Sequence, residues 1–255
     1  MTRRSSEVSA RGAPAAPAGD SSRVPLKLAP NGDILRENFT RERMESLRQE
    51  MAQRGDRTLL THDQREADRA RFLRRWDRQS DLWVFGYGSL MWNPAIHVAE
   101  TQPAKLFGLH RAFCLQLTLG RGSHERPGLM LALDHGGSCR GIAHRISPDL
   151  AESETEILWM REMLSGAYRP VWTRIRLPDG SAPRYAFTFV INRRHTRYAG
   201  RLDFDAVARR IADAEGQLGT NRAYLYRTVE RLDALGVGDG PMHRLCEKVR
   251  ALAGD

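Results

Sequence analysis

The sequence lacks the features that mark membrane and exported proteins. It contains no run of about eighteen apolar residues, the length expected of a membrane-spanning helix. Its N-terminus also lacks the apolar central region of a secretory signal. These absences indicate neither a membrane span nor export, and we expect a cytoplasmic protein.

Cysteine is scarce, and no metal-binding spacing occurs. The three cysteines, Cys114, Cys139 and Cys246, are too few and too far apart for a disulfide framework or a CxxC redox pair. We expect them to be reduced, buried thiols. The eight histidines include no HExxH motif and no cluster with cysteine at ligand spacing, so we expect no metal site.

The sequence carries a net charge of +9, but this charge is not gathered into one basic block. Arginines are interspersed with acidic residues, as in "RERMESLRQE" at 41–50. There is no zinc-finger spacing and no RNP-like aromatic strand. We therefore expect no nucleic-acid partner, and the sequence does not indicate an oligomeric state.

Composition divides the chain into three parts. Residues 1–24 are rich in Ser, Ala, Pro, Gly and Arg, and predict a disordered tail. Residues 25–80 predict a helical N-terminal extension, with charged helices near 40–51 and 61–76. Thr61 and Gln64 fit a loose capping box at the start of the second helix. We expect one further domain at 81–255.

The third part begins with strands and ends with helices. Strands are predicted at 83–88, 104–118, 128–134, 139–146, 170–177 and 185–192. Turns are predicted at "RGSHERPG" (121–128), "HGGS" (135–138) and "PDGSAP" (178–183). Helices are predicted from Pro148 to about Leu164, and at 203–217, 221–235 and 241–253. This order indicates an α+β fold, either a small curved mixed sheet or a closed β-barrel, with flanking helices.

The stretch "WVFGYGSLMW" at 83–92 begins as a buried strand but places two glycines around Tyr87. It does not match the nucleotide-binding GxGxxG pattern, because Met91 occupies the third glycine position. It does not match the nucleophile elbow GxSxG either. Two interpretations remain: a glycine bulge in a sheet, or a sharp turn whose N–H groups bind an anion.

Glu162 interrupts the almost wholly apolar helix "ILWMREMLSG" at 157–166. At helical spacing, Glu162 lies on adjoining positions with Leu158, Trp159 and Met163. A carboxylate there is paired, raised in pKa by desolvation, or facing a cavity, and these environments suit a general base. The alternative is a structural ion pair or an exposed helix-end charge.

An ordered set of motifs resembles the ChaC-type γ-glutamylcyclotransferases, in their glutathione-specific branch. The motifs are "VFGYGSLMWNP" (84–94), "RGSHERPG" (121–128), "CRGIAHRI" (139–146), "LWMREMLSGAY" (158–168), "YAG" (198–200) and "GTNRAYL" (219–225). The resemblance spans about 81–250. It departs from the family at Ser123-His124, where a Thr-Pro pair is usual.

The resemblance implies cyclisation of the γ-glutamyl group of glutathione to 5-oxoproline, with release of cysteinylglycine and no metal or redox cofactor. Glu162 would be the general acid/base. N–H groups of the turn at 87–90 would bind the γ-glutamyl carboxylate or the oxyanion. The expected substrate-binding residues are Val84, Phe85, Gly86, Tyr87, Gly88, Ser89, Leu90, Arg121, Arg126, Tyr168 and Tyr224.

Other interpretations stay open at this stage. Tyr168 and Tyr224 also suit the rim of an amphipathic core, and Arg121 and Arg126 also suit a solvated loop. The enzyme could act on other γ-glutamyl amino acids or on γ-glutamylamines. A different class of function is a non-catalytic binding or regulatory module with a basic surface.

Overall fold

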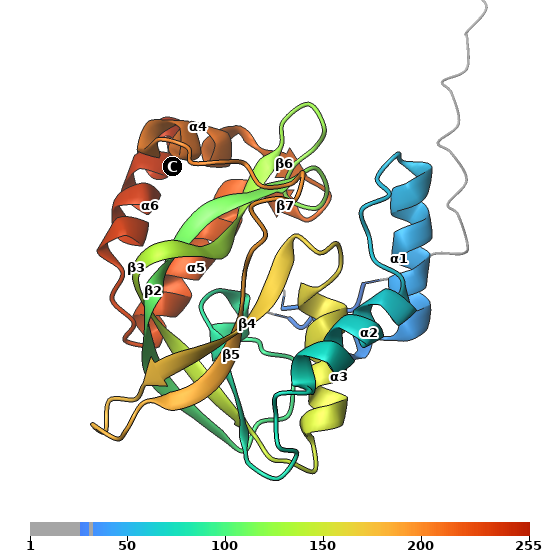
Figure 1. Ribbon diagram of the computed structural model, residues 1–255. Helices are drawn as coiled ribbons and strands as arrows, with labels where there is room; N and C mark the ends of the chain where they lie inside the picture. Colours follow the sequence, from blue (N-terminus) through green and yellow to red (C-terminus); the bar gives the residue numbers. More distant parts are fainter. Residues whose placement is uncertain (1–25, 31–32) are drawn as a thin grey trace, which may run out of the picture.

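The computed structural model of this protein describes residues 26–30 and 33–255 (Figure 1). The predicted disordered tail, residues 1–24, lies outside the described residues, and the domain boundary near residue 81 stays a prediction. Within the described ranges, no helix is long and apolar enough to cross a membrane.

Five strands of the described chain close into a barrel in the order β1-β3-β2-β4-β5. They are β1 (Leu82–Gly86), β2 (Glu100–Leu117), β3 (Gly128–Ile146), β4 (Tyr168–Arg176) and β5 (Arg184–Ile191). The barrel closes where β1 runs parallel to β5, with Val84 opposite Phe187. A two-stranded ribbon, β6 (Glu215–Gly216) and β7 (Gly219–Thr220), lies outside it. The predicted α+β class is confirmed, in its closed-barrel form.

The long strands β2 and β3 form one bent antiparallel hairpin. The prediction of two strands separated by a turn at "HGGS" was wrong, because β3 continues through 135–138. Gly136 and Gly137 do have positive φ angles, 104° and 68°, and Gly108 on β2 has a φ of 84°. The pairing register also shifts between Phe107 and Leu109. The glycines therefore bend the paired strands rather than ending one of them.

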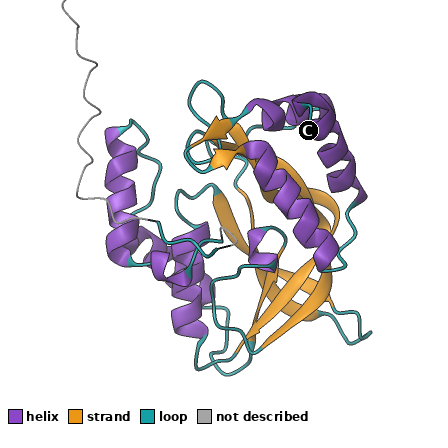
Figure 2. Cartoon of the chain, turned by 180° about the vertical axis from the view of Figure 1, so that it is seen from behind, coloured by secondary structure: helices purple, strands orange, loops and turns teal. Residues whose placement is uncertain are grey.

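Helices lie on two opposite sides of the barrel, as both ribbon views show (Figures 1 and 2). One group is α1 (Arg41–Gln53), α2 (His62–Leu73) and α3 (Ala151–Glu162). The other group is α4 (Phe204–Asp213), α5 (Asn221–Ala234) and α6 (Gly240–Ala253). Short 3-10 helices are η1 (Arg36–Asn38) and η2 (Ser89–Met91). The predicted capping box is present, since Thr61 and Gln64 satisfy each other's backbone N–H groups at the start of α2.

Helix α4 ends earlier than the predicted residue 217. The chain turns into the β6–β7 ribbon there, and the Asn221 N–H donates to the Ala214 carbonyl over 2.8 Å. This contact leads directly into α5, whose N-cap residue Thr220 accepts from the Ala223 N–H. Pairing between chain segments therefore replaces the last turn of the expected helix.

Aromatic packing joins α3 to the barrel wall. The Trp159 ring, fully buried, lies 5.5 Å from the ring of Phe189 and 5.9 Å from that of Phe187 on β5. Phe72 of α2 packs 5.5 Å from Trp159 on another side. The Trp159 indole N–H donates to Asp68 over 3.0 Å, so the buried donor is satisfied. The last turns of α3 are thereby fixed against the barrel.

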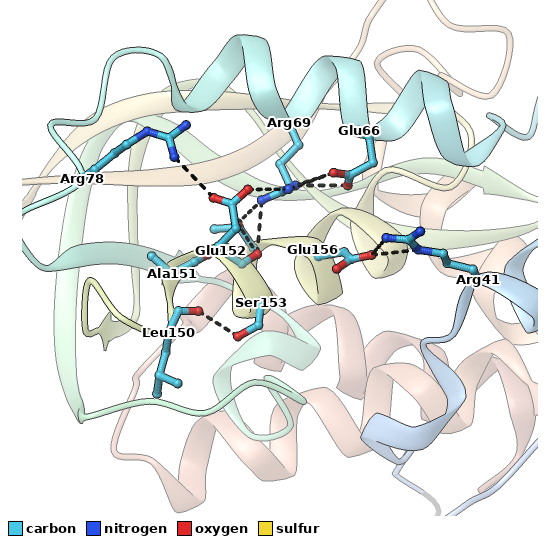
Figure 3. Close-up of polar contacts among 10 residues, drawn as sticks. Arg41, Glu66, Arg69, Arg78, Leu150, Ala151, Glu152, Ser153 and Glu156 are labelled. Carbon is cyan, nitrogen blue, oxygen red and sulfur yellow. Dashed lines mark hydrogen bonds and ion pairs between the residues drawn. The ribbon is translucent and has the colours of Figure 1, made fainter.

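Ion pairs attach α3 to the two N-terminal helices (Figure 3). Arg69 of α2 binds Glu152 over 2.8 Å and donates to Thr155 over 2.9 Å, while also pairing with Glu66 on its own helix. Arg41 of α1 binds Glu156 over 3.1 Å. Arg69 is almost fully buried, and its several carboxylate and hydroxyl partners compensate for its desolvation. The N-terminal helices therefore contribute to the position of α3.

Close contact between β1 and β3 requires glycine at position 141. A β-carbon there would lie well inside van der Waals contact with the Gly86 carbonyl oxygen and 2.7 Å from Cζ of Phe85. Neither obstacle is the end of a flexible, exposed side chain. The close approach of the end of β1 to β3 therefore requires a residue without a side chain at position 141.

We predict that Gly141→Ala lowers the free energy of unfolding by about 1–3 kcal/mol, since it overpacks the barrel wall. Urea denaturation followed by circular dichroism measures this. Gly238→Ala is the matched control, because a β-carbon at Gly238 meets nothing within 4 Å. Equal denaturation midpoints for the two variants would contradict the prediction, because they would show that the barrel accommodates a β-carbon at position 141 without loss of stability.

Candidate active site

The strand β1 ends in a tight turn formed by its Gly-Tyr-Gly-Ser sequence. Residues Ser89–Met91 form η2, and the Met91 N–H donates to the Gly88 carbonyl over 2.8 Å. A β-carbon on Gly86 would lie 3.0 Å from the Leu90 carbonyl carbon, so a side chain there would press on the turn. The glycine allows the chain to fold back against the end of the strand.

A buried histidine on β3 forms a hydrogen bond with the backbone of this turn. His144 Nε2 lies 2.8 Å from the Leu90 carbonyl oxygen, and its Nδ1 lies 3.0 Å from the Thr101 hydroxyl. A carbonyl can only accept, so Nε2 donates and the neutral ring accepts from Thr101. Desolvation lowers the pKa of His144, which keeps the ring neutral. The turn is thus attached to the barrel by its backbone.

Glu162 is the last residue of α3, where the predicted helix continued to Leu164. The difference has a tertiary cause: the Leu164 carbonyl accepts from the Leu60 N–H over 2.7 Å, and Gly166 follows with a φ of 67°. The Glu162 side chain is 14% exposed. Its predicted neighbours Leu158, Trp159 and Met163 are all buried. The carboxylate therefore lies at the protected end of a packed helix.

Arg161 connects Glu162 to the Gly-Tyr-Gly-Ser turn. Its guanidinium donates to Glu162 Oε1 over 2.9 Å, to the Ser89 hydroxyl over 2.7 Å and to the Asn93 carbonyl over 2.6 Å. The Arg161 side chain is 10% exposed. A planar guanidinium with several donors is suited to bridging three groups at once. The two stretches that the sequence singled out therefore meet through one side chain.

Three tyrosines from three parts of the chain lie within electrostatic reach of the Glu162 carboxylate. Tyr87 follows β1, Tyr168 begins β4, and Tyr224 lies on α5 with its hydroxyl 3.7 Å from where a β-carbon on Gly88 would be. Desolvation and the charge of Glu162 raise the pKa of Tyr87, and raise that of Tyr224 to about 12. The pKa of Tyr168 is raised by desolvation, Tyr87 and Glu162. The three hydroxyls are neutral and lie within electrostatic reach of Glu162.

Desolvation raises the pKa of Glu162 above its ordinary value of 4.5, while the charge and hydrogen bond of Arg161 lower it. The burial effect is the larger of the two. Glu162 also occupies the C-terminal end of α3, where the helix dipole disfavours a negative charge. A carboxylate in this setting is a stronger base than an exposed one.

A cavity of about 430 Å³ is lined by Arg161 and Tyr224, while Glu162 lies behind Arg161 and is not a lining residue. Its lining includes Ser89, Trp92, Asn93, Arg121, Arg161, Leu218, Tyr224 and Arg227, together with Leu26, Leu28, Asp33 and Ile34 from the N-terminal segment. Its walls combine leucines with three arginines. The cavity can accept a small anionic molecule with an apolar part.

The structure separates the predicted substrate-binding residues into groups. Ser89, Arg121 and Tyr224 line the cavity. Tyr87, Gly88 and Leu90 belong to the turn after β1, and Tyr168 lies within electrostatic reach of Glu162. Val84 and Phe85 are buried in the hydrophobic core of the barrel, and Gly86 makes the close contact described above. Arg126 is exposed and is not among the residues that line the cavity. Binding of substrate by each of these residues stays a prediction.

The family model described as "ChaC-like protein" matches residues 82–252. This chain belongs to the ChaC-like family.

Curated relatives agree with the ChaC-like assignment, and a solved structure shares the fold. The chain is 41% identical over 194 residues to the glutathione-specific γ-glutamylcyclotransferase of Escherichia coli, covering 76% of this chain and 84% of that protein. It is 29% identical over 170 residues to the human glutathione-specific γ-glutamylcyclotransferase 1, covering 66% and 77% of the two chains. A crystal structure of a yeast γ-glutamylcyclotransferase specific to glutathione superimposes with a TM-score of 0.61 at 21% identity, over 68% of this chain and 96% of that one. The last comparison supports the fold.

Sequence reasoning missed several residues of this ChaC-like site. Arg161 is not among the predicted site residues, although it adjoins Glu162 in the motif "LWMREMLSGAY". Asn93 lies in the first motif, but nothing in its spacing indicated a backbone contact with Arg161. Leu218 and Arg227 lie on the β6–β7 ribbon and α5, far along the chain, and carry no local signal.

We predict that Arg161→Met raises the pKa of Glu162 further, because it removes the neighbouring positive charge and its hydrogen bond. The ionised fraction of Glu162 would then fall at a higher pH than in the wild type. Carboxyl ¹³C NMR of glutamate-labelled protein, assigned with Glu162→Gln, measures the shift. Arg41→Met, which removes the partner of Glu156 on the same helix, serves as control and leaves Glu162 unchanged. An unchanged Glu162 titration in Arg161→Met would contradict the electrostatic role of Arg161.

Proposed function

We propose that this ChaC-like protein is a glutathione-specific γ-glutamylcyclotransferase, which cyclises the γ-glutamyl group to 5-oxoproline and releases cysteinylglycine. The observation that carries the proposal is the shielded Glu162 carboxylate, joined by Arg161 to the glycine turn beside the cavity. The names of the Escherichia coli and human relatives support the same activity.

The reaction needs only a base, a fixed substrate and stabilisation of an oxyanion. The α-amine of glutathione attacks its own γ-carbonyl carbon, so a C–N bond forms and closes the five-membered ring. The original amide C–N bond then breaks, and the proton lost by the amine reaches the departing nitrogen of cysteinylglycine. Atoms balance without water, an oxidant or a metal ion, so no cofactor is proposed.

Glu162 is the proposed carrier of that proton. Its raised pKa lies closer to neutrality than that of an exposed glutamate, which suits a group that takes a proton and then returns it. Arg161 keeps the carboxylate ionised enough to act as a base and fixes its orientation toward the turn. In this reaction Arg161 is a positioning residue for Glu162.

The turn and the tyrosines are the proposed binding groups for the γ-glutamyl half. Backbone N–H groups at 87–90, with the neutral hydroxyls of Tyr87 and Tyr224 nearby, would bind the α-carboxylate and the developing oxyanion. Tyr168 would contribute by packing rather than as a donor, because its hydroxyl donates to the Leu131 carbonyl over 2.7 Å. Freezing the γ-glutamyl chain in a curled form supplies the remaining advantage, since a well-oriented intramolecular attack can gain up to roughly 7–11 kcal/mol.

Arginines on the cavity wall suit the other end of the substrate. Burial lowers the pKa of Arg121, and the like charge of Arg227 lowers it further. A carboxylate bound beside them would relieve this cost and could form paired hydrogen bonds with a guanidinium. Arg121 is thus the proposed partner of the glycyl carboxylate. Arg126, which is exposed, would meet substrate only from outside the cavity.

The same proposal includes the setting of the enzyme. Glutathione is the proposed partner, the cytoplasm is the proposed compartment, and nucleic acid is not a proposed partner. The dispersed arginines support this last point, because many of those in the N-terminal region pair with acidic residues of the same chain.

We predict that Glu162→Gln reduces 5-oxoproline release from glutathione by about 10²–10⁴-fold while the fold is retained, because the amide cannot accept the amine proton. Mass spectrometry of 5-oxoproline and cysteinylglycine measures this, with circular dichroism to confirm the fold. Glu156→Gln, on the same helix, is the control and keeps full activity. Near-normal release by folded Glu162→Gln would refute the assignment of the base.

We predict that glutathione yields at least about tenfold higher kcat/KM than γ-glutamyl-alanine, which shares the cyclising half but has a shorter leaving group, because the cavity extends beyond the space around Glu162. Parallel incubations read for 5-oxoproline decide this. Equal turnover of the two substrates would favour the broader γ-glutamyl specificity, and no turnover of either would favour a binding module.

A further inference from the structure

A segment that precedes the family-matched region forms part of the cavity. The family model begins at residue 82, yet Leu26, Leu28, Asp33 and Ile34 line the cavity beside Ser89 and Arg161. We refer to residues 26–30 and 33–39 as the N-terminal wall. The described part of the wall pairs with itself, since Leu28 bridges to Ile34 and the Ala29 N–H donates to the Asp33 carbonyl over 2.9 Å.

Buried polar contacts anchor the N-terminal wall. The Asn38 side chain, nearly fully buried, accepts from the Lys27 N–H over 2.8 Å and donates to the Lys27 and Leu35 carbonyls over 2.6 and 2.8 Å. Arg36 forms a two-point ion pair with Glu154 of α3, at 2.5 and 3.0 Å. Charged pairs of this geometry are among the stronger polar contacts. The wall is therefore attached to α3 rather than lying loosely over it.

The wall contacts Arg161, the partner of Glu162, directly through Phe39 and indirectly through Asn93. The Asn93 amide donates to the Ile34 carbonyl over 2.9 Å, and the Asn93 carbonyl accepts from Arg161. The Arg161 guanidinium lies over the Phe39 ring, 5.8 Å from its centre. These contacts place the wall next to the side chain that positions Glu162.

Asp33 adds a negative charge to a cavity that otherwise presents arginines. Its carboxylate lies 3.7 Å from the Arg227 guanidinium, and its side chain is mostly buried. Leu28 and Leu218, which face the cavity from the wall and from the β6–β7 ribbon, are 47% and 46% exposed. The end of the cavity formed by the wall thus combines apolar contact with one carboxylate paired to one arginine.

We propose that the N-terminal wall forms the leaving-group end of the active site, and that Asp33 sets how strongly this end favours a leaving group with a terminal carboxylate. The inference rests on the proposed function, since it names which part of the substrate the wall meets. Asp33 shares the positive charge of Arg227 and repels a carboxylate bound nearby. It thereby moderates the affinity for glutathione itself.

The test compares glutathione with glutathione amide, whose glycyl carboxylate is replaced by a neutral amide. Asp33→Asn keeps the size of the side chain and removes its charge. We expect the KM for glutathione to fall about threefold or more and that for the amide to change little, so the preference for the carboxylate rises. Arg227→Gln should move the preference in the opposite direction.

Glu37→Gln is the matched control, because Glu37 belongs to the same wall but is exposed and does not line the cavity. It removes the same charge and should leave the preference unchanged. A preference unaltered in Asp33→Asn, or altered equally in Glu37→Gln, would overturn the inference.

Binding measurements separate this inference from the proposed function. Calorimetry with both ligands in the Glu162→Gln background gives the same preference without turnover. If the wild type released no 5-oxoproline but its ligand preference still changed in Asp33→Asn, the proposed reaction would be rejected. The inferred role of Asp33 in ligand preference would stand. Normal turnover, with a preference for glutathione over its amide that does not change in Asp33→Asn, would reject the inferred role of Asp33 and leave the proposed reaction standing.

Discussion

The Arg161 guanidinium is the contact on which the candidate site depends. It donates to the Glu162 carboxylate, the Ser89 hydroxyl and the Asn93 carbonyl, and so joins the end of α3 to the turn after β1. Without a positive charge there, a carboxylate so well shielded from water would take up a proton more readily. One side chain therefore contacts both the turn and Glu162, and partly offsets the effect of burial on the pKa of Glu162.

The N-terminal region acts on the site through α3. Its arginines, which the sequence presents as dispersed charge, form ion pairs with Glu152, Glu154 and Glu156 on that helix. These pairs and the packing of Trp159 hold α3 in place against the barrel. The segment before residue 82, which lies outside the ChaC-like match, thus packs and pairs with α3 inside the match.

Much of the local structure could be predicted because it depends on short-range patterns. Alternating and continuous apolar runs identified the barrel strands, and Thr61 with Gln64 marked the start of α2. The predicted turn at "HGGS" was wrong because glycines permit a bend as readily as a turn, and only the pairing of β3 with β2 selects the bend. The end of α3 was misplaced because Leu60, distant in sequence, bonds the Leu164 carbonyl.

The sequence alone determined that Glu162 would lie beside apolar residues on a helix and that glycines would follow a strand at 83–92, because helical periodicity and glycine conformation are properties of neighbouring residues. The choice between a glycine bulge and a sharp turn at 83–92 came from the structure. Only the tertiary structure decided that Arg161 bridges these two stretches, and that Asp33 and Arg227 meet at the cavity. Such contacts join residues far apart in the chain. Their geometry depends on barrel closure and helix packing, which no local pattern encodes.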